Sequence, residues 1–82
     1  MYFVYLLKLV NGKIYTGSTP TLKRRIEEHI EGKVVSTRNF RPLELIWYCR
    51  FPRRLKARRF EDYLKTGSGQ AFRNKHLADK IK

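Results

Sequence analysis

The hydrophobic positions at the start of the chain predict a β-hairpin. Residues 2–10 are apolar at almost every position apart from Lys8, which is typical of a strand covered on both faces. The Asn11-Gly12 pair is a strong hairpin signal, and residues 13–17 form the return strand. The chain therefore begins with two antiparallel strands.

Two registers are open for this hairpin, and they place its tyrosines differently. A two-residue loop puts Tyr5 and Tyr15 on opposite faces of the sheet. A three-residue loop, with Gly12 in the left-handed conformation, pairs Leu9 with Lys13 and puts both tyrosines on one face. We predict the second register, because only there can the two phenols form one site.

The next segment predicts a helix that begins after Thr19. Thr19 is a good N-cap, Pro20 suits the first helical position, and Gly32 suits the position past the end. The buried stripe is expected at residues that repeat every four positions, namely Leu22, Ile26 and Ile30.

Polar residues of the same helix fall into two groups. Arg25 and His29 are four residues apart at the edge of the buried stripe, where both can overlook the sheet. Glu27, Glu28 and Glu31 are expected to point outward.

The second half of the chain predicts one more strand and one more long helix. Residues 33–42 form a polar, basic loop, and residues 43–51 form a third strand with Trp47 and Tyr48 as packing groups. Pro52 starts a helix that runs to about Lys65. Residues 67–69 are expected to end this helix, before a short basic helix at about residues 70–77.

Size and charge limit the possible functions. The 82 residues make a single domain over residues 1–82, with a formal charge of +12 from 19 basic and 7 acidic side chains. Such self-repulsion favours a polyanionic partner, and nucleic acid is the leading one. A membrane partner fits poorly, since no helix is basic on one face and richly apolar on the other. The single cysteine, Cys49, excludes an internal disulfide and suits a reducing cytoplasm.

Glu61 is the unusual member of the second long helix. Its spacing puts it on the same face as Ala57 and Leu64, where a carboxylate needs a cation or a metal. An ion pair with an arginine at the edge of the core is one interpretation. The other is a single-carboxylate site for Mg²⁺, which keeps most of its waters.

The arrangement of these residues resembles a known family. Phe3-Val4-Tyr5 is followed at an interval of ten by Tyr15-Thr16-Gly17, then by Arg25, His29 and a helical Glu61. This order resembles the GIY-YIG nuclease domain, and within it the small stand-alone proteins similar to the excinuclease C N-terminal domain. The resemblance extends from Tyr2 to about Lys65.

The resemblance implies a fold, a chemistry and residue roles. The fold is α+β: a three-stranded antiparallel sheet flanked by helices, in the order β-β-α-β-α with a short C-terminal helix. Tyr5, Tyr15 and Arg25 match catalytic positions, His29 matches a histidine of many members, and Glu61 matches the metal-binding glutamate. Phe3 and Thr16 replace the glycine and isoleucine of the two tripeptides, and Ser18 stands where the excinuclease branch has a lysine.

The sequence thus predicts a metal-dependent endonuclease that hydrolyses DNA phosphodiester bonds, with Mg²⁺ or Mn²⁺ as cofactor. Structure-specific cleavage in repair or recombination is the expected context, and RNA is the other candidate substrate. A partner protein or a homodimer would supply specificity. The alternative is a non-catalytic nucleic-acid-binding module. In both cases the backbone contacts come from basic residues outside the site: Arg38, Arg53, Arg54, Arg58, Arg59 and Lys65.

Overall fold

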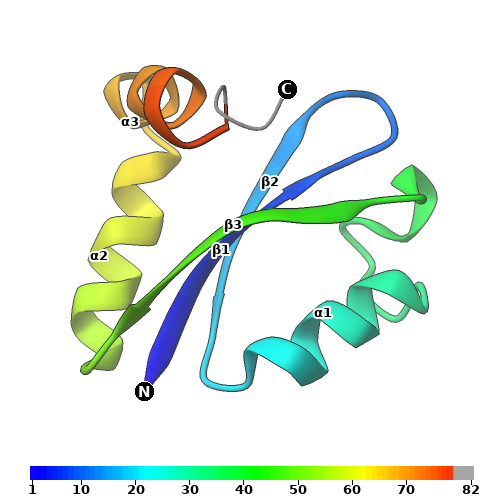
Figure 1. The fold of residues 1–82 in the computed structure, drawn as a ribbon, viewed down its shortest axis with the longest axis horizontal. Coiled ribbons are helices and arrows are strands. Elements are labelled where there is room, and N and C mark those ends of the chain that lie inside the picture. The colour runs from blue at the N-terminus through cyan, green and yellow to red at the C-terminus, as the bar shows by residue number, and fades with distance from the viewer. Residues whose placement is uncertain (79–82) are drawn as a thin grey trace.

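A three-stranded antiparallel sheet forms the centre of the computed structural model, which describes residues 1–78 (Figure 1). The strands are β1 (Tyr2–Lys8), β2 (Ile14–Thr19) and β3 (Glu44–Phe51), in the order β2-β1-β3. The central strand β1 is buried because helices lie on both sides of the sheet (Figure 1). The predicted α+β class and element order are confirmed.

The hairpin between β1 and β2 has the predicted three-residue loop. The Leu9 amide donates to the Lys13 carbonyl at 2.9 Å, and Gly12 has a φ of +84°. Tyr5 therefore lies opposite Gly17, and Leu7 lies opposite Tyr15. Because side chains alternate along a strand, both tyrosines lie on the same face of the sheet.

Helix α1 (Leu22–Ile30) covers this face, starts later than predicted and ends as predicted before Gly32, which has a φ of +79°. It begins after Thr21, because Thr19 is still the last residue of β2 and its hydroxyl accepts a hydrogen bond from the Thr21 amide at 3.1 Å. Ile30 is 56% exposed, whereas His29 is fully buried. The predicted buried stripe is thus wrong at its last position, where the polar residue takes the interior place.

The connection from α1 to β3 contributes buried residues. It contains the short helix η1 (Arg38–Phe40), with Val34 and Thr37 buried before it. The prediction that Tyr48 is a packing group is wrong, since Tyr48 is 53% exposed. It lies on the edge strand β3, where it contacts Phe3 with 6.2 Å between ring centroids.

Helix α2 (Arg54–Leu64) packs on the opposite face of the sheet, and α3 (Gly67–Phe72) and the π-helical segment η2 (Arg73–Ala78) follow it (Figure 1). The core on this side is built on buried apolar residues of β1 and α2: Val4, Leu6, Ala57 and Leu64.

The start of the C-terminal helix also differs from the prediction. Residues 67–69 form the first turn of α3 instead of a break, because the Thr66 hydroxyl caps that turn by accepting a hydrogen bond from the Gly69 amide at 3.0 Å. Over residues 1–78, no helix is both long and apolar enough to cross a bilayer.

Candidate active site

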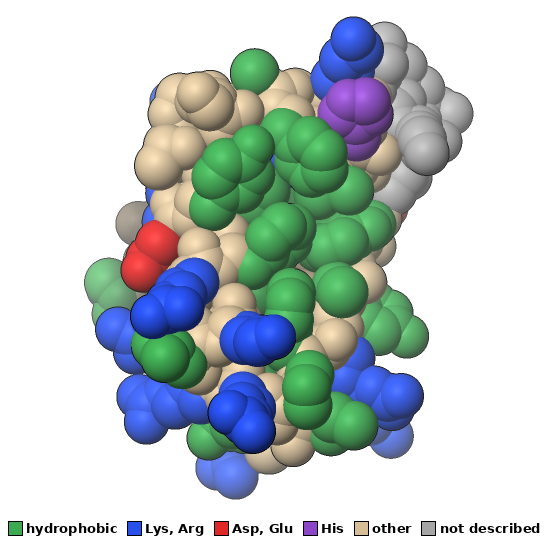
Figure 2. All heavy atoms as spheres, turned by 90° about the vertical axis from the view of Figure 1, so that its left-hand side faces the viewer, with side chains coloured by type: hydrophobic (Ala, Val, Ile, Leu, Met, Phe, Trp, Pro, Cys, Tyr) green, Lys and Arg blue, Asp and Glu red, His purple; other side chains and the backbone are tan. Residues whose placement is uncertain are grey.

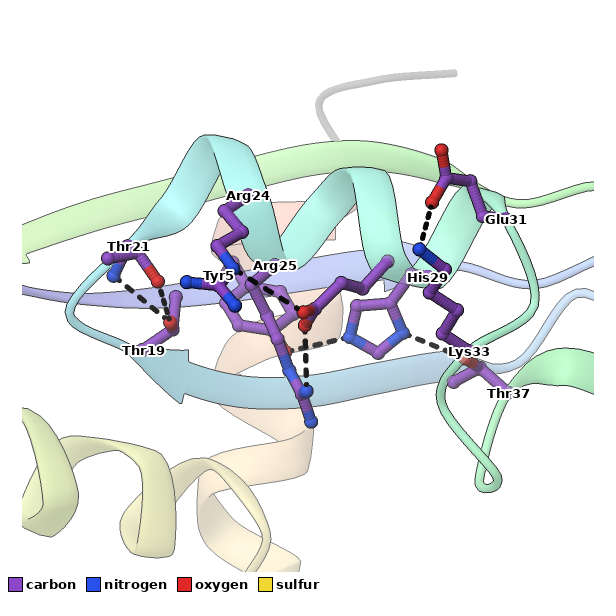
Figure 3. A network of polar contacts seen from close by, with 10 residues as sticks. Tyr5, Thr19, Thr21, Arg24, Arg25, His29, Glu31, Lys33 and Thr37 are labelled. Carbon is purple, nitrogen blue, oxygen red and sulfur yellow. Dashed lines mark hydrogen bonds and ion pairs between the residues drawn. The ribbon is translucent and has the colours of Figure 1, made fainter.

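Tyr5 is the centre of a buried polar chain between the sheet and α1. Its ring is 1% exposed and lies directly over Gly17, where a Cβ atom would overlap the Tyr5 hydroxyl. The hydroxyl is 2.8 Å from His29 Nε2, and His29 Nδ1 is 2.8 Å from the Thr37 hydroxyl (Figure 3). The Tyr15 ring lies beside this chain, with 5.2 Å between its centroid and that of His29.

Burial keeps both central groups of this chain neutral. It raises the pKa of Tyr5 to about 12, although a hydrogen bond from Arg25 acts in the opposite direction. Burial and the positive charge of Arg25 lower the pKa of His29 to about 4. Two tautomers pair both ring nitrogens: the Tyr5 hydroxyl donates to Nε2 while the Nδ1–H donates to Thr37, or the Nε2–H donates to Tyr5 while the Thr37 hydroxyl donates to Nδ1. Every polar group in the chain is then paired.

This buried imidazole should make stability depend on pH. The pKa of His29 is about 4 in the fold and near 6.5 when unfolded, so only the unfolded chain gains a proton between these values. The free energy of unfolding should therefore fall as the pH drops from about 6.5 to 4, by up to about 3 kcal/mol. Urea unfolding at pH 7 and pH 4.5 measures this change.

Two histidine variants provide the control. His29→Gln should remove the pH-dependent fall in the free energy of unfolding that comes from His29. His76→Gln changes an exposed histidine and should retain that fall. Equal pH dependence of wild type and His29→Gln would contradict the assignment.

Arg25 lies at the open side of Tyr5, as Figure 3 shows. Its Nη1 donates to Glu28 Oε1 at 3.1 Å, and Arg24 also pairs with Glu28, at 3.7 Å. Burial alone would lower the pKa of Arg25, but hydrogen bonds to Tyr5 and Glu28 raise it overall, so the guanidinium stays charged.

The predicted outward position of Glu28 is wrong, since this half-buried carboxylate orients Arg25. The Arg25 side chain is 38% exposed, so an anion can reach it from solvent.

Glu61 reaches the sheet from α2. Its Oε1 accepts a hydrogen bond from the Ser18 hydroxyl at 2.6 Å, and its Oε2 pairs with Lys65 Nζ at 2.9 Å. The side chain is only 13% exposed, as its predicted place beside Ala57 and Leu64 requires. Glu61 therefore forms its ion pair with Lys65, one helical turn further along α2. The interpretation from the sequence, an ion pair with an arginine, is wrong.

The two helices bring opposite charges to the same tyrosine. Arg25 lowers the pKa of Tyr5 and Glu61 raises it, so α1 supplies a cation and α2 an anion within electrostatic reach of one phenol. Tyr15 also raises that pKa. The structure therefore gathers Tyr15, Arg25 and His29 around Tyr5 on the α1 face of the sheet, whereas Glu61 contacts Ser18, whose side chain points to the α2 face.

A metal at this site would depend on one carboxylate. Within residues 1–78 there is no group of three or more His, Cys, Asp or Glu side chains that could enclose an ion. Zn²⁺ prefers such a closed nitrogen and sulfur set, whereas Mg²⁺ binds through one or two carboxylates and keeps its waters. Glu61, oriented by Ser18 and beside the 54% exposed Lys65, fits only the second kind of site.

The predicted nucleic-acid contacts lie in different places. A groove of about 320 Å³ lies between the end of β2 and α2, and Arg54 and Arg58 line it together with Ser18. Arg53 is exposed just before α2 and Arg59 is exposed elsewhere on that helix, whereas Arg38 is exposed on η1 on the other side of the sheet (Figure 1). Lys65 pairs with Glu61 and so belongs to the site itself.

Two residues of the site carry no clear signal in the sequence. Thr37 holds His29 from a loop without periodicity, so only the fold identifies it. The sequence shows that Ser18 replaces a lysine of the excinuclease branch. It does not show that Ser18 bonds to Glu61, which is 43 positions away.

Comparisons with known proteins identify the family. Residues 1–76 match the family model described as the GIY-YIG catalytic domain. A UPF0213 protein of Nitratidesulfovibrio vulgaris is 36% identical over 66 residues, which cover 79% of this chain but only 60% of that protein. A UPF0213 protein of Staphylococcus haemolyticus is 34% identical over 70 residues, which cover 84% of this chain and 85% of that protein. The solution NMR structure of the UPF0213 protein BH0048 from Bacillus halodurans matches with a TM-score of 0.59 and 30% identity, over 99% of this chain and 87% of that one. The chain therefore belongs to the GIY-YIG family of nuclease domains, as the spacing of its two tyrosine tripeptides predicts.

Proposed function

We propose that this protein is a metal-dependent endonuclease that hydrolyses DNA phosphodiester bonds, at branched, nicked or flapped sites that arise in repair or recombination. One observation carries the proposal: two tyrosines and a buried histidine pack together on the face of the sheet that carries Arg25, and Glu61 bonds to Ser18 of the same edge strand from the other face. A cation that can neutralise a phosphate and a carboxylate that can hold a metal thus flank β2, the strand that carries the second, half-buried phenol, Tyr15.

Arg25 is suited to the charge that develops on the phosphate. Its guanidinium presents several N–H donors in a fixed plane, and Glu28 uses only part of them. The remaining donors can bind the non-bridging oxygens, where negative charge grows as the water oxygen bonds to phosphorus and the bond to the 3′ oxygen breaks. Arg25 thus stabilises the transition state.

The two tyrosines have different roles in this proposal. Because burial raises its pKa to about 12, Tyr5 stays protonated and serves as a positioning residue, held by the buried His29. Tyr15 orients the attacking water or accepts its proton.

Glu61 is the proposed metal ligand. Ser18 fixes the direction of its carboxylate through the 2.6 Å hydrogen bond, and Lys65 compensates its charge from the solvent side. A bound Mg²⁺ or Mn²⁺ would polarise a phosphoryl oxygen and stabilise the leaving oxygen. Lys65 is exposed and can turn away, since it holds Glu61 through a single contact at the end of a flexible side chain.

The groove beside the site provides a path for the DNA backbone. Arg54 and Arg58 line it next to Ser18, so phosphates bound there lie close to Glu61. Such contacts position a duplex without reading its sequence. We infer that specificity comes from DNA shape, from a partner protein or from a homodimer, with Arg38, Arg53 and Arg59 as further backbone contacts. A cytoplasmic location suits the single cysteine.

A pair of neighbouring arginines tests the proposal. Wild type should cut branched DNA in the presence of Mg²⁺ or Mn²⁺, and Arg25→Ala should be slower by about 100-fold or more, because the transition state loses a charged donor. Arg24→Ala removes the same charge from a side chain that is 79% exposed and should cut within a few-fold of wild type. Initial rates on one labelled junction measure the difference. Equal rates for the two variants would overturn the role of Arg25.

One observation favours a second candidate function, a non-catalytic nucleic-acid-binding module. Both carboxylate oxygens of Glu61 already have partners, Ser18 and Lys65. If wild type binds DNA with a steep salt dependence but never cuts it with either metal, this second function replaces the first.

A further inference from the structure

A continuous band of aromatic side chains covers the outer side of α2 and α3. Ring centroids are 6.1 Å apart from Trp47 to Phe60, 6.4 Å from Phe60 to Tyr63, 6.2 Å from Tyr63 to Phe72 and 5.0 Å from Phe72 to His76. We call these five residues the aromatic band. Figure 2 shows hydrophobic side chains gathered along this face of the molecule.

The band has a buried base and an exposed end. Trp47 and Phe60 are half-buried and pack against the core between the sheet and α2. Tyr63 and Phe72 are 42% and 37% exposed, which is unusual for two neighbouring aromatic rings.

Hydrogen bonds, in addition to the contact between the exposed rings, attach α3 to α2. The Thr66 hydroxyl accepts from the Gly69 amide and donates to the Tyr63 carbonyl at 2.7 Å, so backbone contacts form the joint. A Cβ atom at Gly69 would overlap that carbonyl, so only glycine allows this close approach. The joint is tight, and it fixes the rings of Tyr63 and Phe72 relative to each other.

Positive charge accompanies the band. On α2, Arg59 is one turn and Lys56 two turns before Tyr63, so all three lie on one side of the helix, and both basic side chains are exposed. Figure 2 shows Lys and Arg side chains along the lower part of the hydrophobic band. This side is the opposite edge of α2 from the one that carries Glu61 into the site. The band is therefore a surface separate from the groove of Arg54 and Arg58.

We propose that the aromatic band binds unpaired nucleobases of a single-stranded segment, which stack on Tyr63 and Phe72 while Arg59 and Lys56 contact the phosphates. Rings flanked by cations suit bases and backbone together, and stacking tolerates any sequence. This proposal rests on the proposed function in one respect only: both require that the protein binds nucleic acid. It adds a substrate feature: an unpaired strand held across α2 from the cutting site, as a flap or branch would present.

Binding to two strands of equal charge tests this inference. The probes are a labelled oligothymidine of about 12 nucleotides and an abasic strand of the same length, titrated in EDTA so that cleavage plays no part. Wild type should bind the oligothymidine about 10-fold more tightly than the abasic strand. Tyr63→Ala should lose most of this preference, and Tyr63→Phe should retain it, because phenylalanine keeps the stacking face.

Two controls separate the band from general effects. Phe40→Ala removes an aromatic ring of similar exposure, 39%, from η1 on the other side of the molecule and should keep the preference. Arg25→Ala should also keep it, so failure of the cleavage proposal and failure of this one are distinguishable. Equal binding of both strands by wild type would overturn the inference. A wild-type dimer in sedimentation that becomes monomeric with Tyr63→Ala would also overturn it and assign the band to a second copy of the chain.

Discussion

Glu61→Gln is expected to lower the rate of DNA cleavage by at least about 100-fold while leaving the fold intact. Glutamine has the same shape as glutamate and can keep an oxygen within reach of the Ser18 hydroxyl, but it loses the negative charge that a divalent metal requires. DNA affinity should be unchanged or slightly higher, because the variant is more positive. Initial rates with saturating Mn²⁺, together with DNA binding measured in EDTA, separate the two effects.

The adjacent residue provides the matched control. Asp62→Asn makes the same chemical change one position along α2, on a side chain that is exposed instead of turned toward the sheet. It should cut at close to the wild-type rate. If Asp62→Asn and Glu61→Gln lose activity equally, the effect belongs to the charge of the helix and not to a metal ligand.

Gly17→Ala is expected to disrupt the site through Tyr5. A methyl group at position 17 would overlap the hydroxyl and the ring of Tyr5, which is buried and cannot turn into solvent without leaving His29. The displaced hydroxyl would leave His29 Nε2 unpaired in the interior. The combined cost is about 2–3 kcal/mol in the free energy of unfolding, which corresponds to roughly 10–20 °C in Tm for a domain of this size. Cleavage should fall with it, since the proposed mechanism uses Tyr5 as a positioning residue.

Gly67→Ala is the control for this substitution. A Cβ atom at position 67 meets no atom within 4 Å, and the residue lies in the first turn of α3. Its stability should equal that of wild type or slightly exceed it, because alanine restricts the unfolded chain. Thermal unfolding followed by circular dichroism compares the two. A Gly17→Ala protein as stable and active as wild type would show that the contact between position 17 and Tyr5 is unimportant.

Local patterns were sufficient for the features that depend on neighbouring residues. The Asn11-Gly12 turn predicts the hairpin but leaves two registers open, and the three-residue loop is predicted because only it places Tyr5 and Tyr15 on one face. Apolar spacing on α2 likewise predicts that Glu61 turns toward the sheet. These features follow from turn geometry and helical period, which the sequence encodes directly.

Features that depend on tertiary contacts were not predictable in this way. The spacing of apolar residues favours Ile30 as a buried position, yet His29 is buried instead, because Tyr5 and Thr37 satisfy both of its ring nitrogens. The partner of Glu61 illustrates the same point, since Ser18 reaches it only after α2 has packed on the sheet. Hydrogen bonds between distant segments therefore complete the site that the tyrosine spacing begins.

The most direct test of the nuclease assignment is cleavage of a branched DNA by the purified wild-type protein, followed in Mn²⁺, in Mg²⁺ and in EDTA. We predict cutting with at least one of the two metals, none in EDTA, and recovery when metal is added back to the EDTA sample. Cutting that continues in EDTA would contradict the metal role of Glu61. Absence of cutting with both metals, on DNA that the protein demonstrably binds, would contradict the nuclease function.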